Sequence, residues 1–311
     1  MADCAAKGDE FMKQGQKKVK SFGFFGSKWE EAADLFEKAA NNYKLAKCWM
    51  ECCEAYERLS ECHMKLESQY EAATSLVEGA KAAARANPAK SNQLLQRAVG
   101  MYTDMGRLNM AARQLKDIGE NNEKAGLKAE AIAFYEKAAD LFEAEKEGSS
   151  EATKCKLKIA EFQADLGKFR EAAALFEAVA KLAVENNLLK YSARGYLLNA
   201  GICLLCYANV EELSRKMDSY RDIDLQFERS REETLLEALV EAFRQQDEKM
   251  FATSLAEFDG VTRLDAWKTR ILLEGKKRIS DMELGVGGGA RGRGGGSDRD
   301  DVSDNDSDDL L

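Results

Sequence analysis

Few side chains in this sequence have the type and spacing that enzymatic chemistry or metal binding requires. His63 is the one histidine among 311 residues, so a Ser-His-Asp or Cys-His site would lack its usual base. Cys203 and Cys206 form a single C-x-x-C pair in an apolar helical segment, without the second ligand pair that a structural zinc site needs. The sequence therefore predicts a protein that is not an enzyme and binds no metal or cofactor.

The end of the chain combines glycine, arginine and aspartate. The stretch "GGGARGRGGGS" lacks the G-K-[ST] ending of a phosphate-binding loop and opens no helix. Residues 297–311 hold seven Asp and one Arg, a net charge of −6 out of −9, which leaves −3 for residues 1–296. Overall charge therefore argues against nucleic-acid binding. We expect residues 285–311 to be a disordered tail, because so few apolar residues cannot offset the entropy of ordering.

Residues 20–28, "KSFGFFGSK", place Phe22, Phe24 and Phe25 among two glycines. A helix would space such rings three or four residues apart, and a strand would alternate them with polar residues. The stretch therefore predicts an apolar loop. Its rings either contact another surface or pack back onto the first helical hairpin.

The composition predicts helices throughout the rest of the chain. Ala, Glu, Lys and Leu are abundant, and Pro88 is the one proline. The longest apolar run, 196–208, is too short to span a bilayer, and residues 1–20 lack the apolar core of a signal peptide. The cysteines lie mostly inside amphipathic helical patterns, which is typical of a reduced, cytoplasmic protein.

A unit of about twenty residues recurs along the chain, as in "EEAADLFEKAA", "AEAIAFYEKAA" and "REAAALFEAVA". Each unit combines small residues, which let helices approach closely, with one large apolar residue that fills the groove beside them. Two units make a helical hairpin of about forty residues. We predict an all-α fold: a tetratricopeptide-like right-handed solenoid of antiparallel hairpins over residues 1–195, forming a twisted sheet, and a C-terminal helical bundle over 196–284.

Several long blocks of this sequence resemble the soluble NSF attachment proteins, most closely the alpha type. The resemblance runs from about residue 7 to 281 and resumes at the last few residues. The blocks that carry it are "FGFFGSKWEEAADLFEKAANNYKLAK", "MYTDMGRLNMAAR", "LLKYSARGYLLNAGICLLC", "RLDAWKTRILLEGKKRI" and the terminal "DDLL".

The resemblance implies an adaptor and its partners. Members of the family bind the four-helix SNARE complex of syntaxin-like and synaptobrevin-like proteins, several copies per complex, and recruit the hexameric AAA ATPase NSF to disassemble it. They are cytoplasmic and associate peripherally with membranes. Phe22, Phe24 and Phe25 hold the positions of a loop that touches the bilayer. Burying such a ring is worth roughly 1.5–3 kcal/mol.

The SNARE bundle is an acidic rod, so an adaptor needs cations along one face. Two pairs share a helix face by their spacing, Lys154 with Lys158 and Tyr191 with Arg194. The resemblance implies SNARE contacts at Lys47, Arg107, Arg113, Lys154, Lys158, Tyr191 and Arg194, with Lys44 and Arg85 as additions.

The NSF end departs from the family pattern. Of four acidic positions that face NSF, Glu241 matches, whereas Ala208, Arg244 and Gln245 stand at the others. The tail ends in Asp308, Asp309 and Leu310, which match the family's terminus that stimulates NSF. Two alternatives stay open: a divergent paralogue that binds SNAREs but engages NSF poorly, and a generic tetratricopeptide co-chaperone scaffold.

Overall fold

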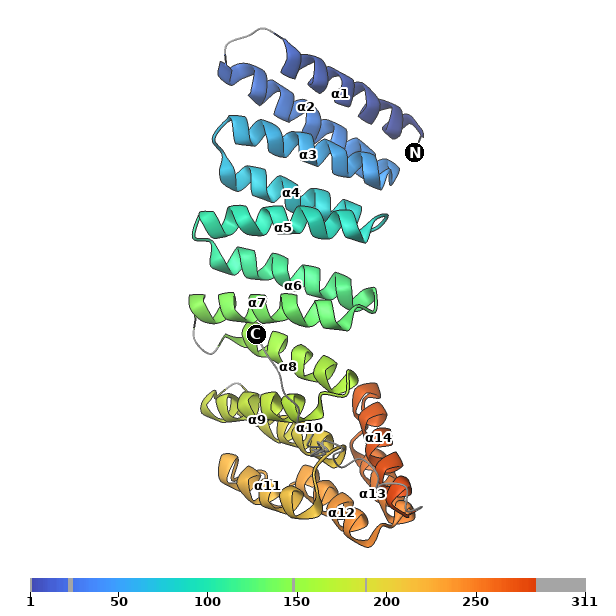
Figure 1. Ribbon diagram of the computed structural model, residues 1–311. Helices are drawn as coiled ribbons and strands as arrows, with labels where there is room; N and C mark the ends of the chain where they lie inside the picture. Colours follow the sequence, from blue (N-terminus) through green and yellow to red (C-terminus); the bar gives the residue numbers. More distant parts are fainter. Residues whose placement is uncertain (1, 22–24, 147–148, 188, 284–311) are drawn as a thin grey trace, which may run out of the picture.

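The computed structural model describes residues 2–21, 25–146, 149–187 and 189–283, and this part of the chain is helical without strands. Figure 1 shows a ladder of antiparallel helices in which each helix lies beside the next in sequence. The helices are α1 (Ala2–Lys20), α2 (Phe25–Ala46), α3 (Trp49–Lys65), α4 (Gln69–Ala83), α5 (Pro88–Asp104), α6 (Leu108–Lys124), α7 (Lys128–Glu145), α8 (Ser150–Asp165), α9 (Phe169–Glu185), η1 (Lys190–Ser192), α10 (Ala193–Leu205), α11 (Val210–Ile223), α12 (Arg231–Gln245), α13 (Glu248–Val261) and α14 (Ala266–Glu283).

Short turns of one repeated geometry make neighbouring helices antiparallel. After α5, Gly106 adopts a left-handed conformation with φ of 67°, and the Arg107 N–H donates to the Tyr102 carbonyl at 2.8 Å. This is a Schellman motif, which satisfies carbonyls at the helix end and reverses the chain. The same backbone bond closes turns at Lys47, Glu67, Gly126, Gly167 and Gln246.

The interior of the ladder is built from the small and large residues of the repeat, as predicted. Ala32, Ala39 and Ala72 are fully buried, which lets α2 and α4 approach their neighbours closely. The large residue of each repeat unit is also buried, namely Phe36, Tyr56, Leu76, Leu115, Tyr135 and Phe176. The all-α, tetratricopeptide-like solenoid predicted from the sequence is therefore confirmed.

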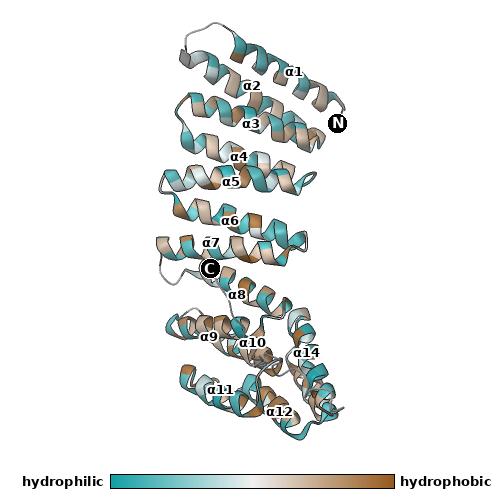
Figure 2. Ribbon diagram, viewed as in Figure 1, coloured by the Kyte–Doolittle hydropathy of each residue, from teal (hydrophilic) through white to brown (hydrophobic). Residues whose placement is uncertain are grey.

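The C-terminal helices share a core with the end of the ladder. One buried cluster runs from Ala160 on α8 to Ile279 on α14, and Figure 2 shows the apolar residues of α9 and α10 in brown. In α10, Gly201 lies so close to Leu236 that an added Cβ would be 2.5 Å from its Cδ1. The expected division at residues 195 and 196 stays a prediction, since the buried side chains continue across it.

Helix α14 contacts helices of the ladder that precede it by about a hundred residues in the sequence. The Trp267 indole N–H donates to the Glu161 carbonyl at 3.1 Å, and the ring lies 5.4 Å from that of Phe176. Arg270 forms an ion pair with Asp165 at 2.6 Å. These contacts fix the C-terminal helices against α8 and α9.

The apolar stretch near residue 22 lies partly outside the described residues. Phe22 and Phe24 belong to the undescribed segment, whereas the backbone of Phe25 begins α2. The helix therefore starts earlier than the expected loop over 20–28 allows. The predicted tail, with Asp308, Asp309 and Leu310, is also outside the described residues.

Candidate protein-binding face

Helices α2, α4, α6 and α8 present charged side chains on one side of the ladder, here called the charged face. Lys44 on α2 lies 3.6 Å from Glu78 on α4, and Lys116 on α6 lies 2.8 Å from Glu151 on α8. A cavity of about 400 Å³ lies between α4, α6 and α8, which places these helices on the same side. The charged face is formed by Lys44, Glu78, Lys81, Arg113, Lys116, Asp117, Glu120, Glu123, Glu151, Lys154, Lys158 and Glu161.

Lys154 belongs to a three-residue ion-pair group centred on Glu151. The Glu151 carboxylate accepts from the Lys116 ammonium at 2.8 Å and from the Lys154 ammonium at 2.6 Å. The hydrogen bond from Lys116, followed by that from Lys154, lowers the pKa of Glu151 to about 2. The Lys154 side chain is nevertheless 62% exposed. It therefore remains accessible to a partner.

Lys158 is held more firmly than Lys154. Its ammonium lies 3.1 Å from a Glu123 oxygen and 3.4 Å from a Glu161 oxygen, and it sits 5.6 Å from the Phe162 ring centre. Burial would lower the pKa of Lys158, but the hydrogen bond to Glu123 and the nearby carboxylates raise it overall. The two predicted lysines do share one face, and both carry acidic neighbours that partly neutralise them.

A cavity beside Arg113 makes the charged face concave at this point. Arg113 donates to the Asn109 side-chain oxygen at 3.1 Å and lines the cavity with Lys81 and Asp117. Gln114 in the cavity wall is buried, and its side-chain oxygen has no hydrogen-bond partner among the described groups. The charged face is therefore hollowed between α4, α6 and α8, with charged side chains around the hollow.

The other predicted SNARE contacts lie at the edges of the ladder, in the turns between helices or, for Arg194, in the first turn of α10. Lys47 follows α2 and Arg85 follows α4, at the edge that carries the α2–α3 turn (Figure 1). The Arg85 guanidinium stacks 4.7 Å from the Trp49 ring centre. Lys47 takes the left-handed position, with φ of 59°, which glycine occupies at Gly106. A residue with a side chain is less favourable than glycine at such a φ, so the conformation of the turn does not explain why a lysine stands at position 47.

Arg107, Tyr191 and Arg194 lie at the opposite edge, which carries the α1–α2 connection (Figure 1). Tyr191 is 65% exposed, with the Lys190 ammonium 5.3 Å from its ring centre. Arg194 is half-buried, and its Nε has no hydrogen-bond partner in the part of the chain described. The predicted contacts thus form a charged face and two flanking edges rather than a single row.

The end of α12 carries the one predicted NSF contact within the described residues. The Glu241 carboxylate accepts from the Gln245 amide at 2.7 Å and is paired with the Arg244 guanidinium. The hydrogen bond from Gln245, with the charge of Arg244, holds the pKa of Glu241 below its usual value. Arg244 and Gln245, which depart from the family pattern, therefore both bind the carboxylate of Glu241, the residue that matches the pattern.

Ala208 does not lie on the surface, contrary to its sequence-based assignment as a surface position lacking a charge. It is 1% exposed, in the connection between α10 and α11. Arg278 on α14 donates to its carbonyl oxygen at 2.6 Å, which holds the connection against the core. A carboxylate at this position would be buried unless the connection moved.

Sequence reasoning missed the acidic partners of the predicted cations. Glu151 lies three residues before Lys154, a spacing that does indicate an ion pair within one helix. Lys116 and Glu151 are 35 residues apart, and their contact depends on how α6 and α8 align. The sequence offered no signal for that alignment.

Comparison with known proteins identifies the family. Residues 6–280 match the family described as soluble NSF attachment protein, SNAP. The chain belongs to the SNAP family. The alpha-soluble NSF attachment protein of Vitis vinifera is 38% identical over 284 residues, covering 91% of this chain and 98% of the relative. The beta-soluble NSF attachment protein of Bos taurus is 38% identical, covering 89% and 95%.

A more distant relative carries a functional name. The probable vesicular-fusion protein sec17 homolog of Schizosaccharomyces pombe is 34% identical to this SNAP, covering 88% of the chain and 97% of the relative. The SNAP match begins in α1 and ends in α14, so the charged face and Glu241 both lie inside the family region. None of the described helices is long and apolar enough to cross a bilayer.

Proposed function

We propose that this SNAP is an adaptor, not an enzyme, for NSF-dependent vesicle fusion. It binds the post-fusion SNARE four-helix bundle, several copies per bundle, and recruits and stimulates NSF, which takes the bundle apart. It works in the cytoplasm, associated peripherally with membranes, and does not bind nucleic acid. The names of its relatives, NSF attachment protein and vesicular-fusion protein, support this role.

The observation that carries the proposal is the placement of cations on rigid helices of one face. Lys154 and Lys158 are fixed by ion pairs, and Arg113 is fixed by a hydrogen bond. Because these side chains are already ordered, binding an acidic rod loses little further side-chain entropy. Their acidic neighbours limit the affinity of each contact. We therefore propose recognition by many weak, salt-sensitive contacts that tolerate varied SNARE sequences.

The membrane contact is proposed for Phe22, Phe24 and Phe25. In sequence they fall at the junction of α1 and α2, and the described ends of these two helices lie at the edge of the ladder that also carries Tyr191. A weak hydrophobic contact of this kind becomes effective when the SNARE bundle already holds the adaptor at the bilayer.

The NSF contact is proposed for Glu241 and the terminal Asp308, Asp309 and Leu310. Arg244 pairs with Glu241 and reduces its attraction for a basic partner. This pairing favours a second candidate function, a divergent SNAP that binds SNAREs but engages NSF less well than alpha-type members.

A pull-down separates the candidates. Immobilised SNARE bundle is incubated with this SNAP, with and without NSF and a non-hydrolysed ATP analogue. The proposal expects retention of SNAP alone and of NSF only when SNAP is present. SNAP retention without NSF supports the divergent candidate, and failure to retain SNAP at physiological salt refutes both.

A further inference from the structure

The cavity between α4, α6 and α8 contains two hydrogen-bond acceptors to which no described residue donates. The Gln114 side chain is only 8% exposed, and its Nε2 donates to the Met110 carbonyl at 3.4 Å. This bond fixes the orientation of the carboxamide and leaves its Oε1 buried without a partner in the described part of the chain. Asp117 also lines the cavity and forms no hydrogen bond or ion pair with a described residue.

Both acceptors are poorly solvated. Burial, and after it the charge of Glu120, raises the pKa of Asp117, although Lys81 and Lys116 act in the opposite direction. A buried oxygen without a donor costs free energy, which a donor from outside the protein can recover. Gln114 and Asp117 are three residues apart on α6, so their side chains lie on one face of the helix. A single group that enters the cavity can therefore reach both.

The cations in the cavity lining determine which donor fits. Lys81 is bound to Glu78 at 2.7 Å, and Lys116 is bound to Glu151 at 2.8 Å. A cationic donor would come close to these two ammonium groups and to the Arg113 guanidinium, which would all repel it. Arg113 can itself donate to an incoming oxygen, because only its Nε donates to a described residue. The cavity therefore favours a neutral group that both donates and accepts.

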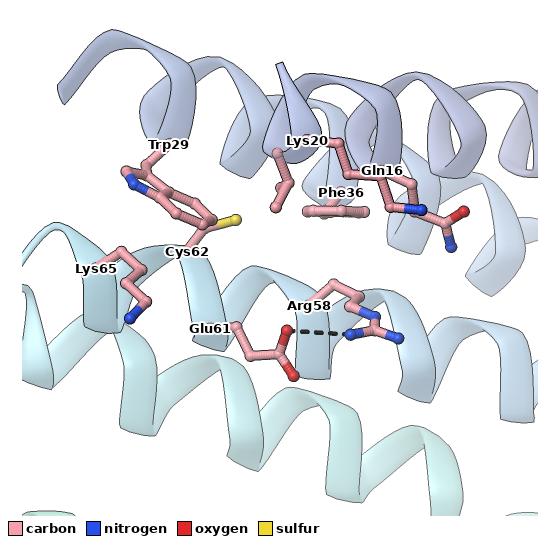
Figure 3. A pocket seen from close by; sticks show the side chains of 9 residues that line it. Gln16, Lys20, Trp29, Phe36, Arg58, Glu61, Cys62 and Lys65 are labelled. Carbon is pink, nitrogen blue, oxygen red and sulfur yellow. Dashed lines mark hydrogen bonds and ion pairs between the residues drawn. The ribbon is translucent and has the colours of Figure 1, made fainter. Parts of the chain in front are cut away.

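The polar groups of the pocket between α1 and α3, about 480 Å³ in volume, are arranged differently. Figure 3 shows Gln16 and Arg58 at one end of this pocket and Trp29 and Lys65 at the other, with Phe36 between them in this view. The Trp29 indole N–H is buried and has no acceptor among the described groups. Because the polar groups do not meet at one point, they do not define a common ligand.

We propose that the cavity between α4, α6 and α8 binds the side-chain carboxamide of a glutamine or asparagine on the surface of the partner rod. The two N–H groups of that carboxamide donate to the Gln114 Oε1 and to the Asp117 carboxylate, and its oxygen accepts from Arg113. A hydroxyl group has one donor and would satisfy only one of the two acceptors. The inference rests on the proposed function for the identity of the rod. Among contacts that depend on charge, this one selects a neutral side chain and so fixes the position of the adaptor along the rod.

A carboxamide scan of the rod tests the assignment. Each exposed glutamine or asparagine of a soluble SNARE bundle is changed to glutamate or aspartate, which keeps the shape of the side chain and removes its N–H donors. Binding of the full chain is measured at physiological salt. At other positions the added negative charge should leave binding unchanged or strengthen it. At the position that enters the cavity, binding should weaken roughly fivefold, the effect of about one hydrogen bond.

Gln114→Met and Gln163→Met form a matched pair of variants. Each removes a carboxamide oxygen that has no partner among the described groups, but Gln163 on α8 lies outside the cavity lining. Both variants should keep the melting temperature of the wild-type protein or raise it, because an apolar group replaces an unsatisfied polar atom. Only Gln114→Met should weaken binding to the unaltered rod, again roughly fivefold. In that variant the change in the rod that weakens wild-type binding should have an effect of less than about twofold.

The outcomes separate this inference from the proposed function. If the wild-type chain does not bind the SNARE bundle, the proposed function and the carboxamide contact both fail. If the chain binds but no carboxamide of the rod is coupled to Gln114→Met, or if Gln163→Met weakens binding equally, only the carboxamide contact fails. Coupling of Gln114→Met to a lysine or arginine of the rod, in a parallel scan to methionine, would overturn the contact in favour of a cationic ligand.

Discussion

Replacing Arg244 and Gln245 together with glutamate should improve the proposed NSF contact. In the wild-type protein Glu241 and Arg244 sum to zero charge, and both neighbours hold the Glu241 carboxylate. The double variant carries three negative charges there. Exposed charge pairs contribute about 0.2–1 kcal/mol each, so binding to a basic surface should strengthen by roughly tenfold.

The same variant should lower the stability of α12. Three acidic side chains would then crowd the last turn, where the helix dipole favours cations. We expect a loss of roughly 1–2 kcal/mol, from the dipole, the repulsion and the lost Glu241–Arg244 pair. Circular dichroism and thermal unfolding would show whether the helix persists under assay conditions.

The assay is ATP-driven disassembly of a soluble SNARE bundle by NSF, at low and at high salt. The increase in the disassembly rate should be smaller at high salt, because salt screens the new charges. Arg263→Glu is the matched control, because it makes the same change in charge as Arg244→Glu in the exposed connection between α13 and α14. Unchanged disassembly in the double variant, or an equal gain from Arg263→Glu, would refute a local effect at the end of α12.

Three further predictions concern other parts of the molecule. Reversing the charges of Lys154 and Lys158 should abolish SNARE capture while helicity persists; undiminished capture at physiological salt would remove them from the interface. Phe24→Ser with Phe25→Ser should slow disassembly of membrane-anchored SNARE complexes only, and an equal defect on soluble complexes would make the rings structural. The free energy of unfolding, measured with urea, should fall between pH 5 and pH 3 by about 1 kcal/mol less in Lys116→Met than in the wild-type protein. The same pH dependence in both proteins would contradict this.

The sign of the pH effect follows from Glu151. Its pKa is about 2 in the folded protein, below its ordinary value of 4.5. The stabilisation is therefore complete above about pH 4.5 and is lost as the pH falls toward 2. Because Glu151 is about one third exposed, solvent screening reduces its contribution well below the full shift.

The helical ladder was predictable because the repeat encodes it locally. Buried alanines such as Ala32 and large residues such as Phe36 recur with the period of one helix and one turn. Gly106 marks a turn that requires a left-handed residue. These signals depend only on neighbours in sequence.

Parts of the candidate site depend on long-range packing, and the sequence could not show them. The family resemblance treated Ala208 as a surface position, but it is buried in the core of the C-terminal helices, and Arg278 donates to its carbonyl oxygen. Arg244 and Gln245 lie three and four residues after Glu241, so their contacts within the helix were readable from spacing. The pocket between α1 and α3 gathers Trp29 and Lys65 from distant positions, and no local pattern reveals it.

The return of α14 onto α8 has a mechanical consequence. In an open ladder each helix is supported only by its neighbours, so a force applied at one end bends the whole stack like a spring. Here the Trp267 and Arg270 contacts give the C-terminal helices a second connection to the ladder besides the chain through α10. A force applied to α12 is therefore transmitted to α8 and α9 by two routes, through α10 and through the contacts of α14. Elastic bending is then concentrated in α1 to α7, where each helix is supported only by its neighbours in sequence.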